Sequence, residues 1–325
     1  MDISSGHDDS QALAAALGPA LRDACGGRLG PISWFRAAWQ HGGAATGFAP
    51  FTLDNGTTIE SLVKLPVGYH EHRWTCTLGS VVDAKAPDAH LPTPLVLASG
   101  HEVGGHDLAW LVTEKLSGHP LSQGMDADGA LALLTAACDF HEAAAMRRPE
   151  VDPPRTVDWE TSIERSRAKA RDGAIVEGQK WNEAIKHVQR ILPRLLAKWN
   201  HRPCKWWCHG DLHPGNALRR GENGRLVLID LALVHPGHWV EDAVYLERQY
   251  WGRTELLHGV KPVSTLARLR RERGLQVEDT YMDIANVRRV MMASLVPLFI
   301  EREGNPKYVH AALETIHNLL PMVSK

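Results

Sequence analysis

The sequence predicts an α+β protein with a small, antiparallel, strand-rich lobe followed by a larger, mostly helical lobe. Short apolar runs separated by turn residues fill 31–118, as in antiparallel sheets. From Asp126 onward, apolar residues recur at helical spacing instead. A chain of 325 residues also exceeds the usual size of a single hydrophobic core. We therefore expect a helical extension at 1–30, an N-terminal lobe at 31–118 and a C-terminal lobe at 119–325.

The N-terminal lobe should consist of strands joined by tight turns. Small and turn-forming residues interrupt the apolar runs at 40–47, at Asp54-Asn55-Gly56 and at Gly104-Gly105-His106. The expected strands are 32–39, 48–53, 57–65, 95–98 and 108–112.

Three patterns at helical spacing predict helices in the C-terminal lobe. The recurring positions are Leu131, Leu134, Cys138 and His141 in the first, Trp181, Ile185, Val188, Leu192 and Leu195 in the second, and Val309, Leu313, Ile316 and Leu320 in the third.

The most informative segment of the chain is the loop 207–216. His209, Asp211 and Asn216 form an H-x-D-x-x-x-x-N arrangement, in which four residues separate the Asp from the Asn. Kinase catalytic loops also have four residues between their catalytic base and their metal-binding Asn. This spacing indicates phosphoryl-transfer chemistry, in which Asp211 takes or orients the proton of an attacking hydroxyl.

A hairpin that presents a second carboxylate should follow this loop. Leu226–Ile229 is a short apolar run after the turn-like segment 221–224, so its strand would end at Asp230. A carboxylate there is costly to bury unless it is paired or binds a cation. Because magnesium prefers oxygen ligands, Asn216 and Asp230 suit a magnesium ion that also binds phosphate oxygens.

The segment 209–216, followed by Leu228-Ile229-Asp230, resembles the catalytic core of the aminoglycoside phosphotransferase family in the protein-kinase-like superfamily. Gly210 stands where protein kinases usually have Arg, which is the pattern of the small-molecule branch. The resemblance implies a bilobal protein-kinase-like fold with ATP and Mg²⁺ as cofactors. It also implies transfer of the γ-phosphoryl group to a small-molecule hydroxyl, with an aminoglycoside, another antibiotic or a hydroxylated metabolite as the acceptor. The sequence departs from many relatives after Asp230, where they have an aromatic residue and this chain has Leu231.

Two residues around the catalytic loop are expected to support it. By resemblance to the family, His209 should be a structural histidine that holds the loop. Asp242 lies in 236–246, which resembles the family's G-x-x-x-x-D-L-A helix start, and would brace the loop by accepting hydrogen bonds from backbone N–H groups. A helix N-cap is the simpler role for Asp242 and is compatible with bracing.

The N-terminal lobe should bind the nucleotide. Gly42 and Gly43 lie in a small-residue turn, where glycine lets the backbone approach phosphate closely, although tight hairpins carry such residues without a ligand. Lys64 resembles the kinase strand lysine that binds the α- and β-phosphates.

A helix and a hinge should complete the nucleotide site. Glu71 is the nearest candidate for the carboxylate that pairs with Lys64; the alternative is an exposed helix residue, as is typical of Glu. The segment 113–118 resembles the family's hinge, where backbone groups read adenine. Glu114 and Leu116 would therefore contact the base whatever their side chains.

Glu241, Glu247 and Trp251 are the candidate acceptor-binding residues. Carboxylates would attract a cationic aminoglycoside, and a Trp ring could stack on a flat or sugar-like acceptor. The alternatives are neutralisation by interspersed arginines such as Arg248 and ordinary core packing of the aromatic ring.

A zinc site is a competing interpretation of the same loop. His209 and His213 could bind a metal with Asp211, and the segment 204–209 contains two cysteines and a histidine. Zinc sites usually pair a C-x-x-C knuckle with a second knuckle or a spaced His pair, and the sequence contains neither, so we disfavour this interpretation.

Two other classes of protein share the kinase-like pattern. A protein kinase is disfavoured by Gly210 and by the lack of an Ala-Pro-Glu segment. A catalytically silent, nucleotide-binding relative would usually have lost at least one of four residues, and all four are present here: Lys64, Asp211, Asn216 and Asp230.

Composition indicates which kinds of binding partner and which cellular location to expect. The formal net charge of −2, with 23% charged residues, argues against nucleic-acid binding driven by bulk electrostatics. No apolar run is long enough to span a membrane, and 1–30 is not a typical secretory signal. Five cysteines without a disulfide-like framework suit a reducing cytoplasm. We expect a cytoplasmic monomer or homodimer.

Overall fold

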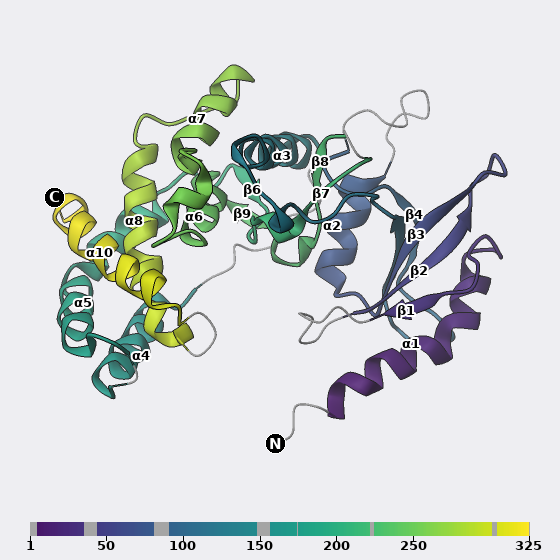
Figure 1. Cartoon of the computed structure of the whole chain (residues 1–325), viewed down its shortest axis with the longest axis horizontal. Helices are drawn as coiled ribbons and strands as arrows, with labels where there is room; N and C mark the ends of the chain where they lie inside the picture. Colours follow the sequence, from purple (N-terminus) through teal and green to yellow (C-terminus); the bar gives the residue numbers. More distant parts are fainter. Residues whose placement is uncertain are drawn as a thin grey trace. The chain divides into compact units, whose positions relative to one another are not determined.

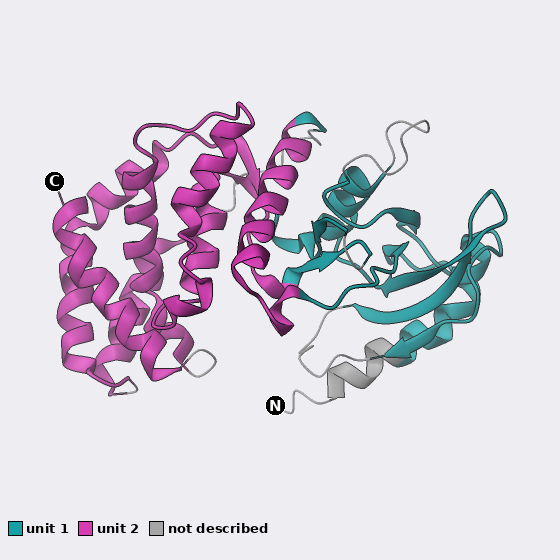
Figure 2. Cartoon of the chain, turned by 45° about the horizontal axis from the view of Figure 1, so that its top comes forward, with its two compact units in different colours: residues 1–120, 146–149, 216–234 teal, residues 121–145, 150–215, 235–325 magenta. Residues whose placement is uncertain are grey.

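The computed structural model describes residues 5–35, 44–80, 91–147, 157–173, 175–221, 224–300 and 304–324. The chain divides into two compact units, shown in teal and magenta in Figure 2. Unit 1 comprises 1–120, 146–149 and 216–234, and unit 2 comprises 121–145, 150–215 and 235–325. The catalytic-loop motif is therefore divided between the units, since Asp211 belongs to unit 2 and Asn216 to unit 1.

The described residues of unit 1 form a five-stranded antiparallel sheet, a separate two-stranded hairpin and two helices (Figure 1). The sheet strands are β1 (Ser33–Phe35), β2 (Ala45–Thr52), β3 (Thr58–Leu65), β4 (Val96–Gly100) and β5 (Trp110–Glu114). The hairpin strands are β7 (Ala217–Arg219) and β8 (Leu226–Leu228), the helices are α1 (Ser5–Ala24) and α2 (Tyr69–Gly79), and a short 3₁₀ turn, η3 (Leu231–Leu233), follows the hairpin.

The strands of the sheet lie in the order β1-β2-β3-β5-β4. β2 and β3 form a long hairpin, with Ala45 opposite Leu65 and Thr52 opposite Thr58. Along β2, buried and half-buried positions alternate, as expected of a strand with one face on the core. β5 pairs with β3 on its other side, so that Lys64 lies opposite Leu111. The central strands thus fix the position of Lys64.

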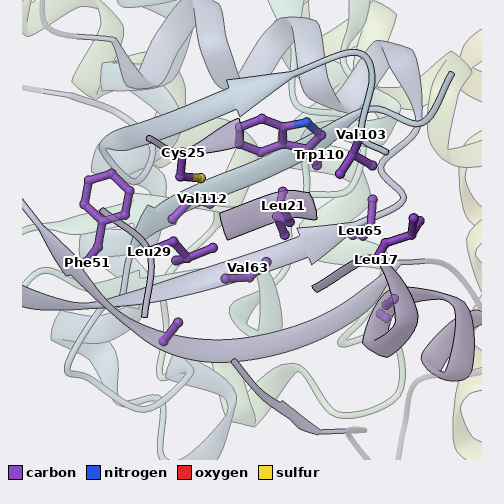
Figure 3. Packing of buried hydrophobic residues seen from close by; sticks show 13 residues of the cluster. Leu17, Leu21, Cys25, Leu29, Phe51, Val63, Leu65, Val103, Trp110 and Val112 are labelled. Atoms are coloured by element: carbon purple, nitrogen blue, oxygen red, sulfur yellow. The ribbon is translucent and has the colours of Figure 1, made fainter. Parts of the chain in front are cut away.

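The helix α1 belongs to the hydrophobic core of unit 1. Its residues Leu17 and Leu21 pack with Leu29, Val63 and Trp110 in one cluster of buried side chains (Figure 3). Leu21 and Val63 are completely buried. The expected helical extension is therefore present, and it covers one face of the sheet instead of standing apart from it.

Unit 2 is mostly helical. Its helices are α3 (Ala127–Met146, whose last residue falls in unit 1), α4 (Trp159–Arg171), α5 (Gly178–Asn200), α6 (Val240–Arg248), α7 (Pro262–Glu272), α8 (Tyr281–Ala293) and α10 (Pro306–Val323). Two short strands, β6 (Trp206–Cys208) and β9 (His235–Gly237), pair antiparallel. Short 3₁₀ turns occur at η1 (Leu121–Gln123), η4 (Thr254–Leu257) and η5 (Val296–Phe299), and η2 (Pro214–Asn216) ends the catalytic loop.

The periodic patterns expected from the sequence correspond to α3, α5 and α10. Every periodic position of α5 is buried, as expected of an amphipathic helix. Leu131 in α3 is an exception, because its side chain is 36% exposed on the outer face of the helix.

The fold class expected from the sequence is confirmed: an antiparallel sheet domain precedes a helical domain. Three strands differ clearly in extent, since β2, β4 and β5 occupy 45–52, 96–100 and 110–114 instead of 48–53, 95–98 and 108–112. The turn that contains Gly42 and Gly43 lies outside the described residues. Within the described part of the chain, no helix is both long and apolar enough to cross a lipid bilayer.

Candidate active site

A pocket lies in unit 1, between the sheet, α2 and the end of the β7–β8 hairpin. Its walls combine apolar side chains with three charged ones, and the lining residues are Leu62, Lys64, Glu71, Thr75, Thr93, Pro94, Leu111, Thr113, Ile229 and Asp230.

Lys64 and Glu71 form an ion pair at this pocket. The Lys64 ammonium donates to Glu71 Oε1 at 2.6 Å, which joins the end of β3 to the first turn of α2. The lysine side chain is 26% exposed and that of Glu71 13% exposed. Burial lowers the pKa of Lys64, but the carboxylates of Glu71 and Asp230 outweigh it and raise the pKa. Lys64 is therefore a fixed cation, and the expected contact with Glu71 is present.

The hairpin brings Asn216 and Asp230 to the same end of β7 and β8. Ile229 N donates to the backbone oxygen of Asn216 at 3.0 Å, one residue beyond the ladder in which Ala217 pairs with Leu228. Asp230 is exposed and has a left-handed backbone, with φ of 63°. Non-glycine residues rarely adopt this conformation, and such residues cluster at functional sites. Both side chains offer oxygen donors, so the pair fits a hard divalent cation such as Mg²⁺.

Glu114 is braced by an arginine of the hairpin. Its Oε1 accepts hydrogen bonds from Arg220 Nη2 at 2.7 Å and from Leu95 N at 2.8 Å. Its backbone N–H already donates to Leu95 O. These contacts fix Glu114 at the end of β5.

Asp242 fixes the catalytic loop of unit 2 through hydrogen bonds to its backbone. Its two carboxylate oxygens accept hydrogen bonds from His209 N at 2.8 Å and from Gly210 N at 2.9 Å. Asp242 and His209 are both fully buried. Gly210 has a φ of 81°, which a residue with a Cβ adopts only with strain. The expected bracing geometry is present, and it explains why a glycine lies between His209 and Asp211.

His209 folds back over its own loop. Its Nδ1 accepts a hydrogen bond from Asp211 N at 3.2 Å, and Phe140 of α3 packs edge-on against its ring at 5.6 Å between centroids. This arrangement fits the structural role that the sequence predicts for His209.

Asp211 points out of this braced loop with a partly accessible carboxylate. Its side chain is 22% exposed, and His213 Nε2 lies 3.6 Å from Oδ2. Burial raises the pKa of Asp211, but hydrogen bonds from His213 and Tyr245 and the charges of His213 and His209 outweigh it and lower the pKa to about 2. Asp211 is therefore ionised at neutral pH.

Comparison with a family model shows which family the chain belongs to. The model of the phosphotransferase enzyme family (APH) matches residues 81–274, which is more than half of the chain. The chain belongs to the phosphotransferase enzyme family. It is accordingly an enzyme of the small-molecule kinase type, as its motifs indicated.

Solved structures share the fold of this phosphotransferase. An aminoglycoside phosphotransferase from Alicyclobacillus acidocaldarius aligns over 91% of this chain and 92% of its own, with a TM-score of 0.53 and 15% identity. A spectinomycin phosphotransferase solved with ADP and spectinomycin aligns over 93% of both chains, with a TM-score of 0.54 and 12% identity. A choline/ethanolamine kinase family protein from Mesorhizobium loti covers 95% and 97%, with a TM-score of 0.52 and 16% identity. The bilobal protein-kinase-like fold is thereby confirmed. No match was found among curated proteins.

The expected acceptor role of Glu241 in this phosphotransferase needs correction. Its side chain is only 5% exposed, and Oε1 accepts hydrogen bonds from Arg202 Nε at 2.9 Å and from His238 N at 2.8 Å. Burial raises its pKa, but contacts with His235 and the charges of Arg288 and Arg202 lower it well below the ordinary range. Glu241 is a buried structural carboxylate because its charge is already neutralised.

Trp251 and Glu247 also have partners within unit 2. Trp251 is 6% exposed and stacks on Tyr308 with centroids 6.1 Å apart, so it is core packing, the alternative considered from the sequence. Glu247 is more accessible, with a quarter of its side chain exposed, and its Oε2 accepts from Arg289 Nη2 at 2.8 Å. Of the three candidate acceptor residues, only Glu247 keeps substantial accessible surface.

Cys208, His235 and Glu241 form a group whose donor atoms lie within 4.8 Å of one another. Cys208 and His235 face each other across the β6–β9 pair. The carboxylate of Glu241, however, is already bound by Arg202. A divalent cation would have to displace this guanidinium from a buried carboxylate, so the group fits a structural polar cluster better than a metal site.

Sequence reasoning missed Tyr245 and His141. Tyr245 hydrogen-bonds to Asp211, and His141 Nε2 lies 2.9 Å from Asp242 Oδ2. A signal for Tyr245 existed in the sequence, because it lies three residues after Asp242 and such residues share a helix face. His141 gave no such signal, since a polar residue in an apolar periodic pattern usually packs in the core.

Proposed function

We propose that this phosphotransferase transfers the γ-phosphoryl group of ATP to a hydroxyl of a small molecule, with Asp211 as the residue that orients and deprotonates the hydroxyl. The observation that carries the proposal is the pocket in unit 1, where Lys64, Glu71 and Asp230 line one cavity. A fixed cation beside an exposed carboxylate suits a triphosphate with its divalent metal.

In this proposal the residues of unit 1 bind the nucleotide. Lys64 donates to the α- and β-phosphates, and Glu71 keeps its ammonium in position. Asn216 and Asp230 would hold Mg²⁺, which would neutralise charge that develops on the phosphates. Glu114 and Leu116 offer backbone groups to the base. Gly42 and Gly43 would cover the phosphates with backbone N–H groups.

Asp211 acts on the acceptor. Its carboxylate, ionised because its pKa is about 2, accepts a hydrogen bond from the acceptor hydroxyl. As the hydroxyl oxygen bonds to the γ-phosphorus and the bond to the ADP oxygen breaks, Asp211 takes the hydroxyl proton. Because a carboxylate of such low pKa is a weak base, its larger contribution is to orient the hydroxyl for in-line attack.

We further propose a hydroxylated antibiotic, such as an aminoglycoside, or a hydroxylated metabolite as the acceptor. The fold is shared with proteins named for aminoglycoside, spectinomycin and choline or ethanolamine phosphorylation, which supports a small hydroxylated molecule. Glu247 keeps a quarter of its side chain accessible, and Arg289 binds its Oε2, so we assign acceptor binding to its other carboxylate oxygen, Oε1.

The chain contains all four residues that a catalytically silent relative would usually have lost in part, which argues against a silent protein: Lys64, Asp211, Asn216 and Asp230. We also retain the expectation of a cytoplasmic monomer or homodimer. All five cysteines are free, which suits a reducing compartment.

The test is a screen of hydroxylated antibiotics and metabolites for substrate-dependent ADP release, with two variants run in parallel. Asp211→Asn should lower kcat by roughly 10²–10⁴-fold while ATP affinity changes little, since this residue acts on the acceptor proton. Asp230→Ala should abolish the Mg²⁺-dependent thermal stabilisation by ATP. Near-normal turnover in Asp211→Asn, or an unchanged ATP-induced shift in Asp230→Ala, would exclude the corresponding assignment.

A further inference from the structure

Arg220 links the β7–β8 hairpin to two parts of the sheet domain. Its Nε and Nη2 atoms donate to Glu114 Oε1 at 2.9 Å and 2.7 Å. Nη2 also donates to Thr93 O at 3.0 Å. The side chain of Arg220 is 27% exposed and that of Glu114 is 20% exposed, so solvent screens the ion pair only in part. One guanidinium therefore holds both the end of β5 and the segment that leads into β4.

The sheet holds Glu114 independently of this arginine. Glu114 lies opposite Ser61 of β3 in the strand ladder. Its N–H donates to Leu95 O at 2.9 Å, and its Oε1 accepts from Leu95 N at 2.8 Å. These contacts come from β3 and from the segment before β4, and the hairpin contributes nothing to them. Loss of Arg220 would therefore leave the end of β5 in place and release its connection to the hairpin.

Two points of attachment hold the hairpin against the segment before β4. Leu228 N donates to Pro92 O at 2.8 Å, close to the end of the hairpin that carries Asn216 and Asp230. Arg220 forms the second attachment at the other end of β7, next to the turn. Two separated contacts fix the tilt of a two-stranded hairpin, whereas one contact leaves it free to pivot.

We propose that Arg220 is a positioning residue that sets the β7–β8 hairpin in register with the end of β5, so that one nucleotide with its metal engages both. The inference rests on the proposed nucleotide role of unit 1. In that role the end of β5 receives the base, and Asn216 and Asp230 receive the metal. Two linked contacts add to affinity only when the spacing of their sites fits the ligand. Arg220 fixes this spacing because it binds Glu114 directly.

The test compares ADP affinity without and with magnesium, measured by isothermal titration calorimetry on the full chain. ADP in EDTA engages the groups that the sheet supplies, whereas Mg·ADP also engages the hairpin. Arg220→Met removes the ion pair and keeps a long apolar stem. We expect Arg220→Met to lower the Mg²⁺-dependent gain in ADP affinity by about 10-fold, while ADP affinity in EDTA changes by less than about 2-fold.

Arg219→Met is the matched control. Arg219 is the preceding residue of the hairpin, and its Nη1 donates to Gly224 O at 3.3 Å, within the hairpin itself. This variant should keep the wild-type gain. An unchanged gain in Arg220→Met, or an equal loss in Arg219→Met, would overturn the proposal. A loss in Arg220→Met that is as large in EDTA as in Mg²⁺ would also overturn it, because a general disturbance of the fold weakens both.

Arg220→Lys covers the case in which the methionine variant does not fold. Lysine keeps the charge but lacks the planar fork that reaches Glu114 and Thr93 together, so the gain should fall by about 3-fold. A full gain in Arg220→Lys would then refute the coupling. Wild-type protein that binds no ADP would instead refute the proposed function. Wild-type binding of Mg·ADP with a full gain in Arg220→Met would refute the coupling alone.

Discussion

At the residue scale, the surroundings of Asp211 and Asp230 differ in a way that suits different tasks. Asp211 is partly buried, and hydrogen bonds from His213 and Tyr245 lower its pKa, so the carboxyl stays ionised. Asp230 is exposed at the end of a strand, in a left-handed backbone conformation that turns it toward the pocket with Lys64. The first is prepared to accept a hydrogen bond from one hydroxyl. The second is open to a hydrated cation.

Tyr245→Phe should raise the pKa of Asp211 from about 2. A hydrogen bond to a charged group contributes about 1.5–3 kcal/mol, and one pKa unit corresponds to about 1.4 kcal/mol, so we expect a rise of about one to two units. Carboxyl ¹³C NMR of labelled aspartate measures this directly. Tyr250→Phe is the control, because its hydroxyl contacts Met125 Sδ instead. An Asp211 titration that is the same in both variants would contradict the contact.

At the element scale, the nucleotide pocket depends on contacts between neighbouring elements. β3 supplies Lys64, α2 supplies Glu71, and the β7–β8 hairpin supplies Asp230. Arg220 of the same hairpin binds Glu114 at the end of β5. Because Glu71 binds Lys64 across the pocket elements, movement of α2 would change the position of Lys64.

Glu71→Gln should lower kcat/KM for ATP by about 10-fold, because one lost charge-assisted contact is worth about 1.4 kcal/mol or more. The neutral amide no longer draws the Lys64 ammonium toward α2. Glu60→Gln is the control on the same strand, since Glu60 is 59% exposed and forms a loose pair with Lys115 at 3.6 Å. Steady-state kinetics with varied ATP measures kcat/KM for both variants. Equal values in Glu71→Gln and Glu60→Gln would contradict the role of Glu71 in positioning Lys64.

Helix α1 offers a stability test of its packing on the sheet. Leu21 is fully buried in the core cluster, whereas Leu13 on the same helix is 41% exposed. Leu21→Ala should cost about 2–5 kcal/mol through lost burial and the cavity left behind. Leu13→Ala should change the free energy of unfolding by less than about 0.5 kcal/mol. Urea unfolding followed by circular dichroism distinguishes them, and equal losses would contradict the packing.

At the scale of the whole molecule, buried histidines make the fold sensitive to acid. Burial lowers the pKa of His72, His141 and His238 below the ordinary value of 6.5. The unfolded chain therefore binds protons near pH 6.5 that the folded chain does not accept. Asp242 and Glu241 have lowered pKa values too, and their contribution is lost only at more acidic pH.

The free energy of unfolding should consequently fall as the pH decreases from 7.5 to 5.5, since the unfolded state takes up more protons over that range. A further fall should follow below about pH 4, where unfolded carboxylates bind protons. Urea unfolding at several pH values measures both phases. A free energy that rises between pH 7.5 and 5.5 would show that these histidines are not held neutral.

The sequence by itself determined the small-molecule kinase class of the enzyme and the local geometry of the hairpin. Roles for Asp211, Asn216 and Asp230 could be proposed because the spacing of a short loop and a two-stranded hairpin is set by nearby residues. The fold class followed from periodicity, which depends on which face of each element avoids water.

Only the tertiary structure decided which polar groups are already occupied. Glu241 and Trp251 had suitable side chains for an acceptor site, yet both are buried in unit 2. His141 binds Arg270, which lies 129 residues away in the chain. Burial and pairing of this kind depend on how distant helices pack, and no local pattern records it, because the free energy of a buried charge is set by its neighbours in space.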